Sequence, residues 1–424
     1  MFSRFRRILL IPKRILLIPK FGLLAISVAL VGACAAGVPL IATAASPGSV
    51  AEARGGAGVL GSMEAAATPA VASLPASATP SKSASTSKKT PSAKTGSAGN
   101  AGAVANGPTV FGYAAPEILA WSQSEQVQQL EAMKATGVTS IRLDASWWWG
   151  QPNGPGSYDW GPLDQVMSAI QQVGMTADLI IDGCPAWAAV SGQAGNQNAS
   201  PASPAAYATW AAAVAQRYGG KGAKYFEIWN EPNNPQFWAP APDPAAYTAI
   251  LKAAYPAIKA VDPSAIVLSA GLSPAVNDGD SISPITFLQD MYADGAQGNF
   301  DGLGFHPYSY PVDPNVDNPQ SAWSQMDQTD PSIRSIMEAN GDGSKKIYIT
   351  EFGAPTDDPS AANVSESDQA AELSEAISEV KTYPWVGAFY IFTWEDGDGT
   401  GFGVLNSDGS QKPSYSAVVS ALQG

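Results

Sequence analysis

Two glutamates stand where a pair of carboxyl groups could carry out acid–base chemistry. Glu231 ends the apolar run "YFEIWNE" (225–231), Glu351 ends "KIYITE" (346–351), and each is followed by a loop that contains proline. When two carboxyl groups face each other, one can protonate a leaving oxygen while the other attacks carbon or activates water. The pair therefore predicts cleavage of a glycosidic bond. The competing interpretation is that either glutamate only forms an ion pair with Arg142.

The elements that must position these residues are short apolar runs that alternate with longer amphipathic stretches from residue 109 onward. The runs are rich in β-branched and aromatic residues, as strands are, and several stretches begin with Ser-Pro or Asp-Pro and end at glycine, as helices do. Eight strand–helix units over residues 109–424 predict an α/β fold, the (β/α)8 or TIM barrel. A doubly wound sheet is the alternative, but no glycine-rich phosphate loop accompanies the strands. The predicted strands lie at 109–113, 139–144, 176–182, 224–231, 265–271, 300–308, 346–353 and 386–394.

In a barrel of this kind, the active site lies at the carboxyl ends of the strands. Glu231 and Glu351 are 120 residues apart, which corresponds to three strand–helix units, so both should project into the barrel mouth from strands 4 and 7. Arg142 lies between apolar residues in strand 2 and should point inward, where a buried arginine needs a carboxylate such as Glu351. The other polar or aromatic residues near predicted strand ends are Asp144, Asp182, Asn230, His306, Tyr308, Trp394 and Glu395.

The segments "FEIWNEPN" (226–233) and "YITEFGAP" (348–355) resemble the signature of retaining glycoside hydrolases with glutamates on strands 4 and 7. This is the clan that includes families 5 and 39, and the resemblance extends over essentially all of residues 109–424. It implies that Glu231 is the acid/base and Glu351 the nucleophile. The carboxyl groups of a retaining pair should lie about 5 to 5.5 Å apart.

The same resemblance assigns roles to residues around the glutamates. Asn230 would bind the sugar 2-hydroxyl, and Arg142 would hydrogen-bond the nucleophile and keep it ionised. The segment "HPYSYP" matches the part of strand 6 that supplies a histidine and an aromatic hydroxyl, here Tyr308 and His306, the only histidine of the chain. Trp394 would be the stacking platform beneath the cleaved sugar.

Tryptophans are the second source of expected sugar contacts, because flat aromatic faces stack on pyranose rings. The segment "SWWWGQPNGPGSYDW" (146–160) holds four of them, and Trp149 is our candidate substrate contact among these. The chain departs from the family pattern at the end of strand 3, where "DGCPAWA" stands in place of an Asn- or His-containing signature. Asp182 is therefore only a candidate contact.

The charge is unevenly distributed along the 424 residues. The chain has 23 basic and 37 acidic side chains, of which residues 1–108 hold 11 basic and 2 acidic ones. The remaining residues therefore hold 12 basic and 35 acidic side chains, a net charge of −23. Such an acidic part repels nucleic acid and anionic membranes and favours a neutral or cationic partner; the alternative is that the charge only maintains solubility. Two cysteines, Cys34 and Cys184, cannot build a disulfide framework or a cysteine zinc site. We expect a monomer with no cofactor and no metal, acting on a polysaccharide or oligosaccharide.

The N-terminal segment, residues 1–45, has the pattern of an export signal: six basic residues in the first 20, then an uncharged apolar run. Three endings fit this pattern, namely cleavage after Ala44 or Ala45, lipidation of Cys34 in "VGAC", or retention as a membrane anchor. All three place the rest of the chain at the cell surface or outside the cell. Residues 46–108, rich in Ala, Ser, Thr and Pro, are predicted to be a disordered linker.

The leading functional hypothesis is a secreted, retaining glycosidase that works by double displacement. An endo-acting β-glucanase is the first choice, because the tryptophan-rich loop favours an open groove. The alternatives are a family 39-like β-xylosidase, an enzyme that trims exopolysaccharide, and, from another class, a non-catalytic carbohydrate-binding barrel. Hydrolysis and transglycosylation share the covalent step, and the sequence favours neither.

Overall fold

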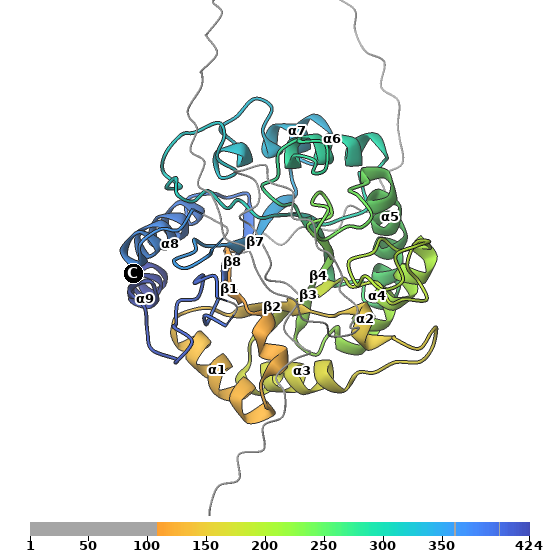
Figure 1. The fold of residues 1–424 in the computed structure, drawn as a ribbon, viewed down its shortest axis with the longest axis horizontal. Coiled ribbons are helices and arrows are strands. Elements are labelled where there is room, and N and C mark those ends of the chain that lie inside the picture. The colour runs from red at the N-terminus through yellow and green to blue at the C-terminus, as the bar shows by residue number, and fades with distance from the viewer. Residues whose placement is uncertain (1–107, 360–361, 398) are drawn as a thin grey trace, which may run out of the picture. The chain divides into compact units, whose positions relative to one another are not determined.

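The chain folds into a closed barrel of eight parallel strands that is surrounded by helices (Figure 1). The computed structural model describes residues 108–359, 362–397 and 399–424. The strands are paired in chain order, and β8 closes the barrel by pairing with β1 in parallel. The predicted (β/α)8 barrel is therefore confirmed, and the doubly wound sheet is excluded.

All eight predicted strands are present, and most of their ends agree with the prediction within one or two residues. The exception is β6, which ends earlier than predicted because the chain leaves the sheet before His306. The end of β8 agrees within two residues, but the strand stops before Trp394. The strands are β1 (Val110–Ala114), β2 (Ser140–Asp144), β3 (Thr176–Ile181), β4 (Ala223–Asn230), β5 (Ile266–Gly271), β6 (Gly302–Phe305), β7 (Lys346–Phe352) and β8 (Val386–Phe392).

Most of the α-helices begin where the sequence provides a side-chain cap. The side chains of Ser203 and Asp243 each accept a hydrogen bond from a backbone N–H in the first turn of α4 and α5, and proline follows both of them. The α-helices are α1 (Gln123–Ala135), α2 (Trp147–Gly150), α3 (Gly161–Val173), α4 (Pro204–Tyr218), α5 (Pro244–Val261), α6 (Pro284–Ala293), α7 (Ile333–Ala339), α8 (Glu366–Val380) and α9 (Pro413–Gln423), and the short 3-10 helices are η2 (Pro116–Ala120) and η3 (Ser324–Met326).

Strand alternation divides the buried residues into an inner and an outer core. Tyr225 of β4 meets Tyr348 of β7 across the barrel interior, with ring centroids 5.6 Å apart. Tyr390 of β8 reaches Ser140 of β2, where the two hydroxyl oxygens lie 2.9 Å apart. The opposite faces of the strands pack against the helices. Residues that share the inward face of their strands therefore point toward the barrel axis, as Arg142 was predicted to do.

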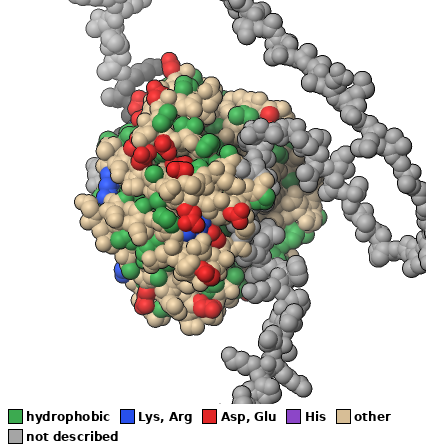
Figure 2. All heavy atoms as spheres, turned by 60° about the vertical axis from the view of Figure 1, so that its left-hand side comes forward, with side chains coloured by type: hydrophobic (Ala, Val, Ile, Leu, Met, Phe, Trp, Pro, Cys, Tyr) green, Lys and Arg blue, Asp and Glu red, His purple; other side chains and the backbone are tan. Residues whose placement is uncertain are grey.

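Several sequence expectations concern the ends and the surface. The expected export signal (1–45) and linker (46–108) lie, apart from Pro108, outside the described residues. Within the described part of the chain, the search for membrane spans finds no helix with the length and apolarity to cross a bilayer. Cys184 is a buried free cysteine. Acidic side chains are scattered over the face shown in Figure 2, on which basic side chains are few.

Candidate active site

The backbone at the ends of β4 and β7 departs from regular strand geometry where the glutamates lie. In a regular strand, neighbouring residues point to opposite faces, so Asn230 and Glu231 would diverge. Trp229 and Glu231 have positive φ angles of 71° and 45°, a conformation that costs roughly 1–3 kcal/mol for a residue other than glycine. This break in the alternation lets both Asn230 and Glu231 reach the barrel mouth. In β7, the pairing register with β8 shifts in the stretch that contains Glu351.

Glu351 is held by donors at both of its carboxylate oxygens. Nη1 of Arg142 lies 2.6 Å from Oε1, and the Tyr308 hydroxyl donates to Oε2 at 2.8 Å. Burial raises the pKa of Glu351, but the charges of His306 and Arg142 and the hydrogen bonds from Tyr308 and Arg142 outweigh it, so the pKa lies below its ordinary value. Glu351 is therefore ionised at neutral pH, as a carboxylate nucleophile must be.

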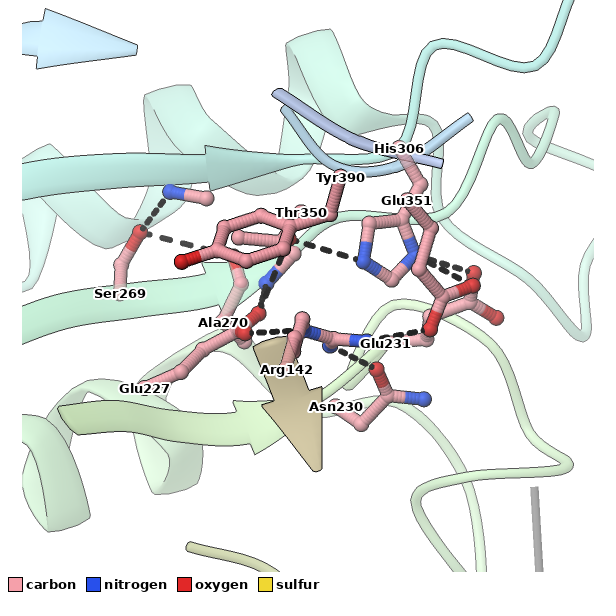
Figure 3. Close-up of polar contacts among 12 residues, drawn as sticks. Arg142, Glu227, Asn230, Glu231, Ser269, Ala270, His306, Thr350, Glu351 and Tyr390 are labelled. Carbon is pink, nitrogen blue, oxygen red and sulfur yellow. Dashed lines mark hydrogen bonds and ion pairs between the residues drawn. The ribbon is translucent and has the colours of Figure 1, made fainter. Parts of the chain in front are cut away.

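Glu231 lies beside Glu351 and shares a histidine with it. Its Oε1 is 2.8 Å from Nδ1 of His306, and Oε2 of Glu351 is 3.7 Å from the same nitrogen (Figure 3). One carboxylate oxygen of each glutamate and a ring nitrogen of His306 all lie within 4.8 Å of one another. An inverting pair needs about 6.5–9.5 Å between its carboxyl groups to admit a water molecule. The 4.8 Å limit joins one oxygen of each glutamate, and this close approach fits a retaining pair.

Arg142 connects Glu351 to Asn230. Its Nη2 donates to Oδ1 of Asn230 at 2.9 Å, and the amide nitrogen of Asn230 points away from the guanidinium in Figure 3. That nitrogen remains a donor for a sugar hydroxyl. The structure thus brings together six of the predicted site residues, and their individual roles stay predictions: Arg142, Asn230, Glu231, His306, Tyr308 and Glu351.

The glutamates and the histidine also carry atoms of the types that ligate metal ions. Both oxygens of Glu351 already accept hydrogen bonds, from Arg142 and from Tyr308. The guanidinium supplies the positive charge that a bound metal would bring to this carboxylate. The residues present therefore fit a hydrogen-bonded acid–base pair better than a coordination site.

Trp394 does not lie in the barrel mouth, so its predicted role as a sugar platform is wrong. The indole is 1% exposed, its Nε1 donates to Gln129 of α1, and its ring packs edge-on against Tyr113 in the outer core. The prediction extended the inward alternation of β8 to residue 394, whereas the strand ends at Phe392. Phe392 belongs to the inner core, and its ring centroid lies 6.3 Å from that of Tyr308.

Replacing Trp394 by alanine should therefore destabilise the fold rather than weaken substrate binding. Loss of a buried tryptophan from a well-packed core typically lowers the free energy of unfolding by about 3–5 kcal/mol. Chemical denaturation of the variant measures this loss, and steady-state kinetics at low temperature measures KM. A raised KM with unchanged stability would instead restore the platform role.

Trp149 and Asp182 are placed differently from the six clustered residues. Trp149 lies on α2 and is 46% exposed, so a ligand could reach its ring, whereas its neighbour Trp147 is buried. Asp182 is half-buried after β3, and its Oδ1 is buried without a hydrogen-bond partner. Burial and the adjacent Asp144 raise the pKa of Asp182. A sugar contact of Trp149 or Asp182 stays a prediction.

Two residues of the network, Glu227 and Thr350, were missed in the sequence. Glu227 is completely buried, and its Oε2 accepts from Nε of Arg142 at 2.6 Å. Its Oε1 accepts from the Gly271 N–H at 2.7 Å and from the Thr350 hydroxyl at 3.2 Å. A signal was available, because Glu227 comes two residues after the inward-facing Tyr225. A charged side chain on the inner face of an apolar strand requires a partner.

Comparisons with known proteins agree with this geometry. The family described as cellulase, glycosyl hydrolase family 5, matches residues 99–388. No curated protein sequence gives a significant match. A family 39 glycoside hydrolase from Bacteroides cellulosilyticus WH2 is similar in structure, with a TM-score of 0.58 and 23% identity over 75% of this chain and 64% of the other.

Two further family 39 structures are similar at a comparable level. The enzyme from Xanthomonas axonopodis pv. citri has a TM-score of 0.56 and 22% identity over 74% of this chain and 65% of its own. A β-xylosidase from Caulobacter crescentus has a TM-score of 0.53 and 21% identity over 74% of this chain and 70% of its own. The chain thus spans less than two thirds of the Bacteroides and Xanthomonas proteins, and at these identities the likeness concerns the fold alone.

Proposed function

Because this chain belongs to glycosyl hydrolase family 5, the cellulase family, it is a glycoside hydrolase, and we propose that it cleaves with retention of anomeric configuration. Glu351 is the nucleophile and Glu231 the acid/base. The observation that carries this proposal is the close pair itself. Glu351 accepts hydrogen bonds at both oxygens, whereas Glu231 is bonded to His306, and an oxygen of each glutamate lies within 4.8 Å of one of the other.

The reaction proceeds in two displacements. In the first, a carboxylate oxygen of Glu351 bonds to the anomeric carbon while the bond to the glycosidic oxygen breaks and Glu231 gives its proton to that oxygen. In the second, the ionised Glu231 takes a proton from water, whose oxygen bonds to the anomeric carbon and releases Glu351. The pKa of Glu351, lowered by its surroundings, suits the first role. The amide of Asn230 binds the 2-hydroxyl in both steps.

The proposed substrate is a β-glucan that the enzyme cleaves internally. The exposed ring of Trp149 supports an extended binding surface, and the excess of acidic over basic residues favours a neutral or cationic polymer. The runner-up is exo action on a smaller sugar, since a family 39 β-xylosidase shares the fold. Trimming of an exopolysaccharide is the third choice. The expected export signal supports a location at the cell surface or outside the cell.

The test is incubation of the full chain with β-1,4- and β-1,3-glucans, xylan, arabinan, mannan and the host's extracellular polysaccharide, with product lengths resolved. A ladder of oligomers from one glucan is expected. Single sugars alone would instead favour the exo runner-up. Proton NMR of the first product gives the anomeric configuration, and an inverted product would overturn the retaining assignment.

Replacement of Trp149 by alanine should weaken the binding of long chains without weakening the fold. The ring is 46% exposed, so little packing is lost, whereas the stacking of an aromatic ring contributes about 0.5–1.5 kcal/mol. We expect KM for the polymer to rise about 2- to 10-fold, with KM for a short aryl glycoside unchanged. An equal change in KM for both substrates would show that Trp149 does not contribute a contact specific to long chains.

A further inference from the structure

A buried carboxylate, Glu227, joins the two catalytic residues through separate arms. One arm runs from Oε2 to Arg142 at 2.6 Å and from Arg142 to Glu351 at 2.6 Å. The other arm runs from Oε1 to Thr350 at 3.2 Å, from Thr350 to Nε2 of His306 at 3.0 Å, and from Nδ1 of His306 to Glu231 at 2.8 Å. Glu227 is completely buried, yet each catalytic glutamate is only two or three contacts away from it (Figure 3).

The hydrogens of the second arm can be assigned from the donors that surround Glu227. Its Oε2 accepts from the guanidinium of Arg142, and its Oε1 accepts from a backbone N–H. A carboxylate in an ion pair carries no proton and can only accept, so the Thr350 hydroxyl donates its one proton to it. The Thr350 oxygen can then only accept from His306. The ring nitrogen Nε2 of His306 consequently carries a proton whether the imidazole is neutral or cationic.

We propose that Glu227, acting through Thr350, is a positioning residue that keeps Nε2 of His306 protonated, so that this histidine exchanges protons only at Nδ1, the atom that faces Glu231. When the imidazole is neutral, its Nδ1 accepts a hydrogen bond from the protonated carboxyl group of Glu231, which thereby keeps its proton for the first displacement. The opposite tautomer would donate from Nδ1 and stabilise the ionised carboxylate, the wrong form for an acid. This mechanistic consequence rests on the proposed function, whereas the tautomer does not.

The close packing of His306 against β5 supports a built contact. A Cβ added to Gly271 would overlap Nε2 of His306 and would lie 2.6 Å from Oγ1 of Thr350. Only glycine therefore lets the imidazole and the hydroxyl approach each other over this strand. The N–H of the same glycine donates to Glu227 at 2.7 Å.

The titratable groups around His306 come from β2, β3, β4 and β7 and from the segment that follows β6. Glu231 and Glu227 come from β4, Glu351 from β7, and Arg142 from β2, and Tyr308 follows His306 beyond β6. Below them on β3 lies Asp178, completely buried, whose two oxygens have no hydrogen-bond partner in the described structure. Burial and the charge of Glu227 raise the pKa of Asp178 above its ordinary value.

The tautomer can be measured directly because His306 is the only histidine of the chain. Nitrogen-15 NMR of the full, tag-free chain should show a proton on Nε2 throughout, with Nδ1 alone changing as the pH changes. Thr350→Val removes the oxygen that accepts from Nε2 of His306. The proton of the neutral imidazole should then move to Nδ1, which faces the carboxylates of Glu231 and Glu351. Thr350→Ser should restore the wild-type spectrum. Asp178→Asn, a matched change of a buried carboxyl group that makes no hydrogen bond in the described structure, should leave the spectrum unaltered.

Kinetics then tests the consequence for catalysis. Thr350→Val should lower kcat about tenfold on substrates with poor leaving groups, a part of the 10²- to 10⁴-fold that general acid catalysis supplies. The substitution should shift only the alkaline limb of the pH profile, which reports the acid, toward lower pH. A dinitrophenyl glycoside, whose leaving group needs no proton, should react at almost the normal rate. Glu227→Gln, which also disturbs Arg142, should move both limbs.

The outcomes separate this proposal from the proposed function. A wild-type spectrum with the proton on Nδ1, or a spectrum of folded Thr350→Val that matches the wild type, would overturn the positioning role whatever the activity. An inactive wild type with the Nε2 proton in place would overturn the function and leave the tautomer assignment standing. Loss of activity in Thr350→Val to the same extent for all leaving groups, without a moved limb, would reduce Thr350 to a packing residue.

Discussion

Replacement of Glu351 by alanine is expected to lower kcat by about 10⁵-fold, or ~7 kcal/mol of transition-state stabilisation. The variant lacks the oxygen that bonds to the anomeric carbon, and no other carboxylate can take its place without losing its own contacts. The fold should survive, because Arg142 keeps Glu227 as an ion-pair partner at 2.6 Å and no buried charge is left alone. Hydrolysis of the best polymer and of a dinitrophenyl glycoside measures the loss.

A small anion should restore part of the activity of this variant. Azide can occupy the space of the lost carboxylate and attack the anomeric carbon of the dinitrophenyl glycoside, which releases dinitrophenolate and gives a glycosyl azide of inverted configuration. Glu372→Gln is a matched control, because burial and nearby acidic groups raise the pKa of Glu372 to about 8, so that the neutral amide resembles its protonated form. This control should keep full activity. If Glu351→Ala kept a tenth or more of the wild-type rate, another residue would be the nucleophile.

The barrel was predictable because the signal for each strand is local. Strands of a parallel barrel are buried on both faces and therefore read as short apolar runs between turn residues. The helix starts at Ser203 and Asp243 are equally local, since a cap and a following proline lie next to each other in the sequence. The prediction for Trp394 was wrong because it extended a local pattern beyond the end of its strand. The period of two holds only within a strand, and the exact end of β8 depends on packing beyond it.

The site was predictable where chemistry and spacing coincide in one short segment. Asn230 and Glu231 stand in one motif, and Glu351 stands at the end of another. Glu227 and Thr350 escaped notice because their importance depends on a contact between residues 123 positions apart. The bond depends on the register of strands that are not neighbours in the barrel, and no local pattern specifies it. The backbone is irregular at the ends of β4 and β7, so that consecutive side chains point to the same side of the strand. This irregularity is likewise a tertiary property.

Replacement of Glu231 by alanine is expected to divide substrates by their leaving groups. A glycosidic oxygen that must be protonated as it leaves should react about 10³-fold more slowly, whereas dinitrophenolate leaves without a proton. The glycosyl bond to Glu351 would then form at a nearly normal rate but hydrolyse slowly, because no base activates water. Mass spectrometry of the intact protein should show the glycosyl-enzyme accumulating, and the mass increase should map to the peptide that contains Glu351.

Azide gives the decisive contrast between the two glutamates. In Glu231→Ala the anion occupies the space of the acid/base and attacks the glycosyl-enzyme from that side, so the product keeps the configuration of the substrate and turnover recovers. In Glu351→Ala it attacks from the opposite side and gives inversion.

The two carboxylates lie too close together for distance alone to assign their roles, but the hydrogen bonds differ. Arg142 and Tyr308 donate to Glu351, while Glu231 meets only His306 among the hydrogen-bonding side chains of this network. Interchanged azide products would mean that Glu231 is the nucleophile and that the donors around Glu351 serve an acid instead.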